Sequence, residues 1–366
     1  MLIPIAKPLI GNKEIRTALQ ILKSGHITEG EYVEKLEHLF SSYCNTKFAI
    51  AVNTGTAALH TSLYALGLKH GDEVITSPFT FVATANAIKM IGAVPVFIDI
   101  DADTFLINAK KIEEKISKKT KAIIAVDIFG QPADYGEIHT IANKNGLFVI
   151  EDAAQSIGAT YDKKKCGNLG DIAAFSLYAT KNIMCGEGGV ITTNNEDFAN
   201  KSREFRNHGQ SKTTRYHYND IGYNYRLTDL AAGIATEQIK RLDCITQKRQ
   251  TNASLYSSAL SKIAGIVTPK TASNRTHVFH QYTIRVTEAF PLTRDALQRY
   301  LQKKGISANV YYPLPLYRCK HLTPQGDNPN EYPVSEKAVK QVLSLPVYPQ
   351  LTRKEIQYII RAIQSI

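Results

Sequence analysis

Short apolar runs alternate with amphipathic stretches over residues 48–193. The runs are rich in β-branched residues, as in FAIAV (48–52) and KAIIAVDIF (121–129), and the stretches between them carry apolar residues at helical spacing. Strands buried on both faces have such continuous apolar sequences, and strand–helix units of this length join parallel strands. The pattern therefore predicts a mainly parallel sheet with helices on both faces. The expected strands are 48–52, 72–76, 93–100, 121–129, 146–152, 171–178 and 188–194, and helices are expected at 55–68, 80–92, 110–121 and 135–146.

The last two apolar runs, 171–178 and 188–194, are joined by a Gly-rich link with no room for a helix. Such a link turns the chain back on itself, whereas parallel strands need a longer crossover. We therefore expect one edge of the sheet to be antiparallel.

The C-terminal part of the chain has a different pattern. A polar, Tyr-rich segment, 211–226, precedes a long helical pattern that starts at Thr228. The tail opens with Thr352 and, three residues later, Glu355, which is typical of a capping box at the start of a helix. Further expected elements are strands at 280–286 and 307–313 and a helix at 292–305.

These patterns predict two domains in an α/β fold. Residues 1–245 are expected to form a large domain, with the N-terminal segment packed on it, and residues 246–366 a smaller α+β domain. The length of 366 residues suits this division.

Composition narrows the class of protein. Hydrophobic residues make up 43% and charged residues 21%, which is ordinary globular usage and excludes a disordered chain. No apolar stretch is long enough for a membrane-spanning helix, and the N-terminus lacks a signal-peptide pattern. Five scattered cysteines without a CxxC pair argue against a disulfide framework and a zinc site. We expect a soluble, cytoplasmic protein without a metal or a membrane partner.

The formal net charge of +11 needs an explanation. The lysines are spread along the chain, and their densest run, Lys110 to Lys121, contains Glu113 and Glu114, as a solvated helix face does. Plain solubility is the simplest explanation, attraction of a substrate with a diphosphate comes next, and nucleic-acid binding comes last. We therefore expect no nucleic-acid partner.

The segment FSLYATKNIMCGEGGVIT (175–192) places Lys181 after an apolar strand and before a Gly-rich turn. Desolvation at the end of a buried strand lowers the pKa of a lysine and makes its amine nucleophilic, which a Schiff-base lysine requires. Taken alone, a surface lysine that ends the strand is the simpler explanation.

The segment VIEDAAQSIGA (149–159) ends an apolar strand with Glu151 and Asp152. Ligands of open α/β sheets bind beyond the carboxyl ends of the strands, and a carboxylate there can keep a pyridine nitrogen protonated, as in pyridoxal phosphate enzymes. A helix N-cap explains Asp152 equally well.

The segment AVNTGTAALHTSL (51–63) reads as a strand, a glycine turn and the start of a helix. Backbone N–H groups of residues 55–57, with the hydroxyls of Thr54 and Thr56, would cradle a phosphate there. The segment matches neither the Walker A nor the GxGxxG pattern, which argues against ATP and NAD. A threonine N-cap is the alternative, and alone it is favoured.

Together the three segments favour one chemistry. A phosphate site, a strand-end acid and a strand-end lysine follow one another in the chain order of an enzyme that holds pyridoxal phosphate on a lysine. Phe81, in SPFTFVATANAI, adds an aromatic face that could stack on the cofactor ring.

The chain resembles the DegT-type nucleotide-sugar aminotransferases, which are pyridoxal phosphate enzymes of the aspartate aminotransferase fold (fold type I). The resemblance covers nearly the whole chain, from GHITEGEYVEKLE (25–37) through the segments quoted above to NHGQ, GYNYRLTDL, HQYTIRV, YYPLPL and SLPVYP.

The resemblance implies roles for individual residues. Lys181 would carry the cofactor as a Schiff base, and Asp152 would pair with the pyridine nitrogen. Gln155 would contact the side of the ring that bears the phenolic oxygen, and Phe81 would stack on one face. The cofactor phosphate would be bound by Thr56, Ala57, Ser176 and Asn224.

The resemblance also implies a homodimer with shared active sites. Segment 211–226 would reach into the neighbouring subunit, where Asn224 would contact the phosphate and Arg226 the substrate. Further substrate-side candidates are Tyr311 and Tyr312, with His280 and Gln281 as weaker candidates that a polar pair on a strand explains equally well.

The activity that the resemblance implies is transfer of an amino group from L-glutamate, which leaves as 2-oxoglutarate, to a keto group of a nucleotide-diphosphate deoxy sugar for surface polysaccharide or glycan synthesis. GYNYR resembles members that aminate C4, whereas NHGQ followed by RYHY resembles those that aminate C3 of a keto-uronate, and C4 is favoured. Dehydratases of the family carry histidine at the position of Lys181, so transamination is favoured here. Tyr317 stands where many relatives have histidine. A non-catalytic regulator with the same fold is the alternative from another class.

Overall fold

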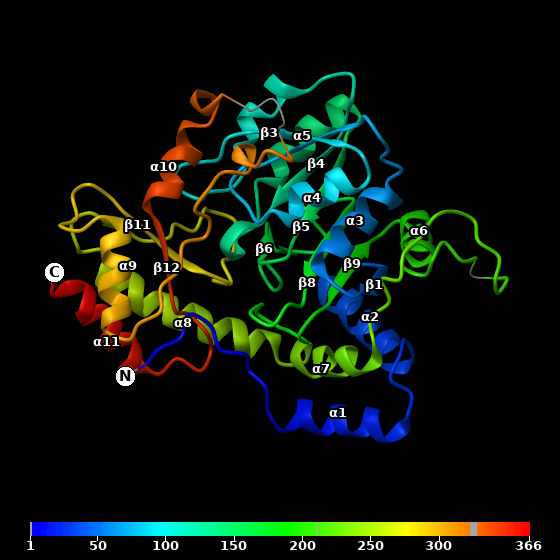
Figure 1. Cartoon of the computed structure of the whole chain (residues 1–366), viewed down its shortest axis with the longest axis horizontal. Coiled ribbons are helices and arrows are strands. Elements are labelled where there is room, and N and C mark those ends of the chain that lie inside the picture. The colour runs from blue at the N-terminus through cyan, green and yellow to red at the C-terminus, as the bar shows by residue number, and fades with distance from the viewer. Residues whose placement is uncertain (1, 212, 323–327) are drawn as a thin grey trace.

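The protein consists of a large α/β part around a central sheet and a smaller part around β11 and β12, beside which both chain termini lie (Figure 1). The computed structural model describes residues 2–211, 213–322 and 328–366. The helices are α1 (Asn12–Ser24), α2 (Glu31–Cys44), α3 (Gly55–Ala65), α4 (Ala83–Met90), α5 (Tyr135–Asn145), α6 (Glu196–Arg206), α7 (Asp229–Ile239), α8 (Leu242–Leu260), α9 (Arg294–Lys303), α10 (Pro333–Gln341) and α11 (Arg353–Gln364). The strands are β1 (Phe48–Val52), β2 (Glu73–Thr76), β3 (Val94–Phe97), β4 (Thr120–Val126), β5 (Phe148–Asp152), β6 (Thr160–Tyr161), β7 (Lys164–Lys165), β8 (Ile172–Ser176), β9 (Gly189–Thr193), β10 (Ile266–Val267), β11 (Tyr282–Val286) and β12 (Val342–Leu345).

The central sheet has the strand order β1-β9-β8-β5-β4-β2-β3. Strands β3, β2, β4, β5 and β8 are parallel, which confirms the expected mainly parallel sheet. The expected antiparallel pairing at one edge of the sheet is confirmed, because β9 pairs antiparallel with β8 on one side and with β1 on the other. The reversed strand therefore lies inside the sheet, and β1 closes the edge beyond it.

Both faces of the sheet are buried, as the continuous apolar runs predict. In β1, Ile50 and Val52 face a core that includes side chains of α3 and α5, whereas Ala49 and Ala51 face a second core beneath α2 and α7. This alternation follows from the two-residue period of a strand.

The helix expected at 110–121 is wrong. Two 3₁₀ turns, η1 (Ala109–Lys111) and η2 (Glu113–Lys115), take its place, and the backbone is already extended at Ile116. Ile112 is fully buried, whereas Ile116 is only partly buried, so the segment lacks a continuous apolar face for an α-helix.

The long helical pattern from Thr228 forms two helices, α7 and α8, with a break at Lys240 and Arg241. The strand expected at 307–313 is also wrong: Asn309 alone pairs there, through backbone bonds with Ser344 of β12. The capping box of Thr352 and Glu355 at the start of α11 is confirmed.

The smaller part is built on an antiparallel sheet, β10-β11-β12, packed against α9, α11 and the second half of α8. The N-terminal segment contacts both parts, since Ile3 pairs with Ile306 and α1 packs on α7. A division after residue 245 would fall near the start of α8 and stays a prediction.

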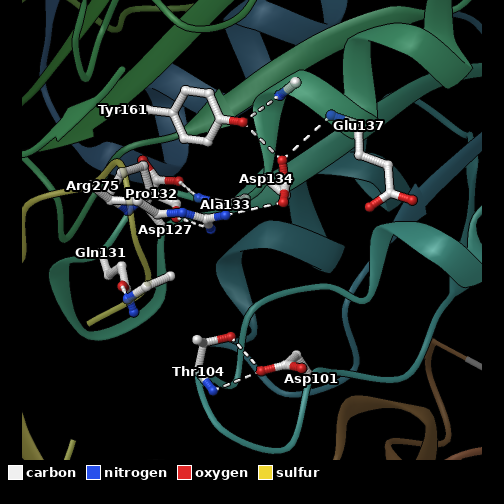
Figure 2. Close-up of polar contacts among 12 residues, drawn as sticks. Asp101, Thr104, Asp127, Gln131, Pro132, Ala133, Asp134, Glu137, Tyr161 and Arg275 are labelled. Atoms are coloured by element: carbon white, nitrogen blue, oxygen red, sulfur yellow. Dashed lines mark hydrogen bonds and ion pairs between the residues drawn. The ribbon is translucent and has the colours of Figure 1, made fainter. Parts of the chain in front are cut away.

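A polar cluster fixes the loop at the carboxyl end of β4 (Figure 2). Arg275 donates to the carbonyl of Pro132 and to Asp134, each at 3.0 Å, and the hydroxyl of Tyr161 donates to Asp134 at 2.8 Å. Asp134 also caps α5 by accepting the N–H of Glu137. These contacts tie three separate segments to the edge of the sheet where β4 and β5 end.

Two carboxyl groups lie in the core below that edge. Asp127 and Glu151 are fully buried, and together with Cys166 they bring their polar atoms within 4.8 Å of one another. Asp127 accepts the hydroxyl of Ser156 at 2.7 Å, and Glu151 accepts two backbone N–H groups at 2.7 and 3.0 Å. Burial raises the pKa of Asp127 to about 7, and burial together with the charge of Asp127 raises the pKa of Glu151 well above its ordinary value.

We predict that Asp127 makes the free energy of unfolding depend on pH. Its folded-state pKa lies above that of the unfolded chain, so the contribution of Asp127 to stability is fully present below about pH 4 and is lost as the pH rises to about 7. Asp127→Asn keeps the shape of the protonated side chain and should make the fall across this range shallower, as measured by urea unfolding at several pH values.

Asp162→Asn is the control, because Asp162 is exposed in the turn between β6 and β7. It should leave the pH profile of wild type unchanged. An equally steep fall in Asp127→Asn and wild type would contradict the prediction.

Candidate active site

Lys181 lies in the turn between β8 and β9, at the carboxyl end of β8. Its backbone N–H donates to the carbonyl of Tyr178 at 2.8 Å, which fixes the start of the side chain. Burial lowers the pKa of the Lys181 amine from 10.5 to about 8, although the charge of Asp152 acts in the opposite direction. A substantial fraction of the amine is therefore neutral, and nucleophilic, near pH 8.

Asp152 is the last residue of β5, and its side chain is only 4% exposed. Its Oδ2 accepts the hydroxyl of Thr84 at 2.8 Å, and its Oδ1 accepts the N–H of Ala154 at 3.3 Å. Burial raises the pKa of the carboxyl, while the bond from Thr84, the bond from Ala154 and the charge of Lys181 lower it. Turns rather than an α-helix follow Asp152 in the described chain, which argues against the helix N-cap as its function.

Gln155 contacts Tyr312, an aromatic residue whose hydroxyl has its pKa raised by burial and by the nearby carboxylate of Asp152. Its Oε1 accepts the N–H of Phe129 at 2.9 Å, and its Nε2 donates to the hydroxyl of Tyr312 at 3.5 Å. The ring of Tyr312 lies 6.2 Å from that of Phe81, which is 56% exposed. The structure thus brings four of the predicted residues, Asp152, Gln155, Phe81 and Tyr312, to one place.

The predicted phosphate site is the N-terminus of α3. Thr54 is its N-cap and accepts the N–H of Ala57 at 3.0 Å, so the alternative explanation of that threonine is confirmed. Ser176 packs against the same turn, since a Cβ added to Gly55 would lie 2.7 Å from the Cβ of Ser176. Gly189 of β9 also lies against this turn: a Cβ added to it would lie 2.4 Å from the carbonyl oxygen of Thr54. The first N–H groups of a helix attract anions, and the helix start and Ser176 are adjacent here.

Segment 220–226 lies beside this helix start in the same chain. The backbone N–H of Asn53 donates to the carbonyl of Tyr225 at 2.8 Å, and the side-chain amide of Asn53 donates to the carbonyl of Asn224 at 3.3 Å. A ring nitrogen of the buried His60 lies 3.1 Å from the hydroxyl of Tyr225. Burial lowers the pKa of His60 to about 4, so the ring is neutral at neutral pH. Asn53, two residues before α3, therefore holds the backbone of Asn224 and Tyr225 beside the start of that helix.

The remaining substrate-side candidates have other partners. Arg226 donates to the side chain of Asn207 at 2.6 Å, and the hydroxyl of Tyr311 accepts from Asn309 at 3.0 Å. Tyr317 is buried, stacks on Tyr332 and hydrogen-bonds Glu336.

His280 lies close to Lys181, which its sequence position alone does not reveal. Its Nδ1 is 3.3 Å from the Oδ1 of Asn182, the residue after Lys181. Burial, with Lys181 and Arg249 nearby, lowers the pKa of His280 well below its usual value, so the ring is neutral. Gln281 is joined to the same region through its backbone N–H, which donates to the carbonyl of Phe129.

Two residues of the site, Thr84 and Asn182, were not predicted from the sequence. Thr84 was visible in the sequence only as the third residue after Phe81 at the start of a helix, a spacing that places two side chains on one face. Asn182 gave no signal beyond its place next to Lys181.

The site offers three groups that suit one kind of ligand. A helix N-terminus can hold a phosphate, a buried carboxylate can face a ring nitrogen, and an amine of lowered pKa can attack a carbonyl carbon. A phosphorylated heteroaromatic aldehyde carries all three partners.

No helix among the described residues is long and apolar enough to span a membrane.

Comparisons with curated proteins find relatives along nearly the whole chain. The "Pleiotropic regulatory protein" of Geobacillus stearothermophilus is 42% identical over 95% of this chain and 93% of its own. A GDP-perosamine synthase of Caulobacter vibrioides is 37% identical over 100% and 98%. The UDP-2-acetamido-2-deoxy-3-oxo-D-glucuronate aminotransferase of Pseudomonas aeruginosa is 38% identical over 94% of each chain.

Solved structures agree with the fold. DesV of S. venezuelae, in complex with a ketimine intermediate, is 33% identical over 96% of this chain and 93% of its own, with a TM-score of 0.91. Spr1654 of Streptococcus pneumoniae, in its PLP form, is 28% identical over 100% and 98%, with a TM-score of 0.94.

The family model for the DegT/DnrJ/EryC1/StrS aminotransferase family matches residues 8–364. This match over nearly the whole chain agrees with the resemblance found in the sequence, and the chain belongs to the DegT/DnrJ/EryC1/StrS aminotransferase family.

Proposed function

We propose that the protein is a pyridoxal phosphate-dependent aminotransferase that moves an amino group from L-glutamate to a keto group of a nucleotide-diphosphate deoxy sugar. The product would serve surface polysaccharide or glycan synthesis. The observation that carries the proposal is that Lys181, whose pKa is lowered to about 8, lies within electrostatic range of the buried carboxylate of Asp152, at the ends of the neighbouring strands β8 and β5.

The residues of the site fit the cofactor. The start of α3, with Thr56, Ala57 and the adjacent Ser176, would hold the phosphate, since the N–H groups and the dipole at a helix N-terminus attract anions. Asp152 would pair with the ring nitrogen, and Phe81 would cover one face of the ring. Gln155 would lie beside the ring, held by Phe129 and Tyr312.

When bound, the cofactor supplies a carbonyl to which amines add and a ring that accepts the resulting electron pair. The Nζ of Lys181 in its neutral form can take the proton from the α-carbon of glutamate and, once charged, return a proton to the sugar carbon. A pKa near 8 suits both directions, because general acid–base catalysis is most efficient when the pKa lies near the working pH.

The sugar substrate is proposed from the relatives and from sequence resemblance. A relative named GDP-perosamine synthase supports a nucleotide sugar, and GYNYR resembles members that aminate C4. The relative that acts on a 3-oxo-glucuronate favours C3 as the second candidate. Arg226 and Tyr311 would lie on the sugar side, together with Tyr312, which contacts Gln155.

A regulatory role is the alternative from a different class. One relative is named a pleiotropic regulatory protein, which gives that alternative its support. The complete set of amine, buried carboxylate and helix N-terminus favours catalysis, because binding alone does not require an amine of lowered pKa.

The first test is a reaction assay with purified protein loaded with pyridoxal phosphate. Glutamate should change the absorption spectrum of the cofactor and yield 2-oxoglutarate, and mass analysis with a panel of 4-keto and 3-keto sugar nucleotides should reveal the aminated product. Lys181→Ala and Lys181→Arg should lose turnover by at least about a thousandfold, since a guanidinium does not deprotonate to act as a nucleophile.

Lys164→Ala, which alters an exposed lysine in β7, should keep wild-type turnover. Retained turnover in both Lys181 variants would disprove the catalytic assignment. A spectrum that does not respond to glutamate, in protein that binds the cofactor, would favour the regulatory alternative.

We also propose that the protein is a homodimer with shared active sites. Segment 211–226 is polar and Tyr-rich, and several side chains in it are exposed, among them Tyr216, Tyr218 and Ile221. Tyrosine and arginine are enriched at interface centres. In this arrangement Asn224 of one subunit would act on the phosphate bound by the other.

A mixing experiment tests the shared site. Lys181→Ala and Asn224→Asp subunits should each be inactive alone, but a heterodimer should have one intact site, because both lesions fall in the same site and leave the other whole. Activity should recover to about one quarter of wild type after random exchange of equal amounts, since half of the dimers are mixed and each has one working site.

Subunit exchange is verified by mass spectrometry of the mixed dimers. If exchange is complete and each variant remains dimeric, a mixture without activity contradicts a site shared between subunits.

A further inference from the structure

The carboxylate of Asp152 is held by a hydroxyl from a different part of the fold. Thr84 is 1% exposed and lies in the first turn of α4, and its Oγ1 is 2.8 Å from Oδ2 of Asp152. The second contact, from the N–H of Ala154 to Oδ1, is longer, at 3.3 Å. Thr84 therefore makes the shorter of the two hydrogen bonds to this carboxylate.

The direction of this bond follows from the charge of the carboxylate. An ionised carboxyl group only accepts, so the hydroxyl of Thr84 donates to it. The oxygen of Thr84 is then free to accept from Thr80, whose hydroxyl lies 3.4 Å away. Hydrogen bonds to charged groups are stronger than neutral ones, and a buried carboxylate is costly without them.

The same turn carries Phe81. The backbone N–H of Thr84 donates to the carbonyl of Phe81 at 3.2 Å, so the two residues belong to one rigid turn. The hydroxyl of Thr84 donates to the carboxylate of Asp152, and the ring of Phe81 lies 6.2 Å from the ring of Tyr312. The hydrogen bond from Thr84 to Asp152 therefore links the turn that carries Phe81 to the carboxylate of Asp152.

We propose that Thr84 is a positioning residue that aims the carboxylate of Asp152 at the ring nitrogen of the cofactor and keeps it in its accepting, ionised form. The inference rests on the role proposed above for Asp152. Burial raises the pKa of Asp152 and the bond from Thr84 lowers it, so loss of the hydroxyl moves the carboxyl towards its neutral form. A neutral acid pairs more weakly with a protonated ring nitrogen.

The test measures cofactor binding and not only turnover. Pyridoxal phosphate is titrated into apo-protein, and the pH dependence of the bound cofactor's absorption is recorded, for wild type, Thr84→Val and Thr84→Ser. Thr84→Val keeps the shape but loses the hydroxyl, and it should weaken cofactor affinity by about tenfold and shift the spectral pH profile. Thr84→Ser should stay within about threefold of wild type.

Two further variants make the result specific. Thr236→Val is the matched control, because Thr236 is a fully buried helical threonine of α7 whose hydroxyl has no hydrogen-bond partner among the described residues. It should leave affinity and the spectral profile unchanged. Asp152→Asn is the benchmark and should change both readouts more than Thr84→Val does.

Each outcome separates the two proposals. If Asp152→Asn alters affinity and spectrum but Thr84→Val matches wild type, the Thr84 inference is wrong and the role of Asp152 stands. If Asp152→Asn also has no effect, the proposed role of Asp152 is itself overturned. Should Thr84→Val unfold, Thr84→Ser and Thr84→Ala provide the same comparison, since they differ by one hydroxyl. A purely structural role would lower the urea midpoint of the apo-protein without changing affinity, which also overturns the inference.

Discussion

A buried carboxylate and a partly buried amine at the carboxyl edge of a sheet constrain the rest of the large α/β part. Removing Asp152 from water raises its pKa, and removing Lys181 from water lowers the pKa of the amine, so each charge is costly there. The attraction between the two offsets part of that cost. Thr84 and Ala154 supply hydrogen bonds that stabilise the carboxylate further.

The alternation of strand β5 divides two acids between two tasks. Asp152 is held by Thr84 and influences Lys181, whereas Glu151, one residue earlier, accepts backbone N–H groups of Gly167 and Leu169 in the core. Neighbouring residues of a strand point to opposite faces, so the carboxyl groups of Glu151 and Asp152 have different surroundings. Glu151 belongs to the buried cluster with Asp127 and Cys166, which has no role in the proposed reaction.

The features that depend on interactions between residues close in sequence were predicted from the sequence. The apolar runs of β1, β5 and β8 and the capping box of Thr352 and Glu355 depend on neighbouring residues, and all of them form. Asp152 and Phe81 were expected at one site from the sequence segments themselves, whereas Gln155 and Tyr312 were added by the family resemblance, and the structure brings these residues together.

Long-range pairing and single side-chain contacts explain the remainder. Nothing within 171–194 indicates that β1, much earlier in the chain, pairs with the other side of β9 and forms the outermost strand. The Lys-rich run after β3 has helical spacing but buries only Ile112 deeply, and burial depends on its surroundings. Thr84 reaches Asp152 across 68 positions of sequence, a distance that no local pattern spans.

The position of β9 has a consequence for how the protein is made. Strand β1 and the turn at Thr54 leave the ribosome early, yet their partner strand, 189–193, is synthesised only after β2, β3, β4, β5 and β8. Until β9 inserts, β1 has no neighbour in the sheet, and the turn lacks Gly189, which closes against Thr54. Contacts so distant in sequence form late, because a long loop must close first. The proposed phosphate site is therefore complete only once the last strand of the sheet is in place, and we expect a nascent chain to bind a cofactor only after that strand has paired.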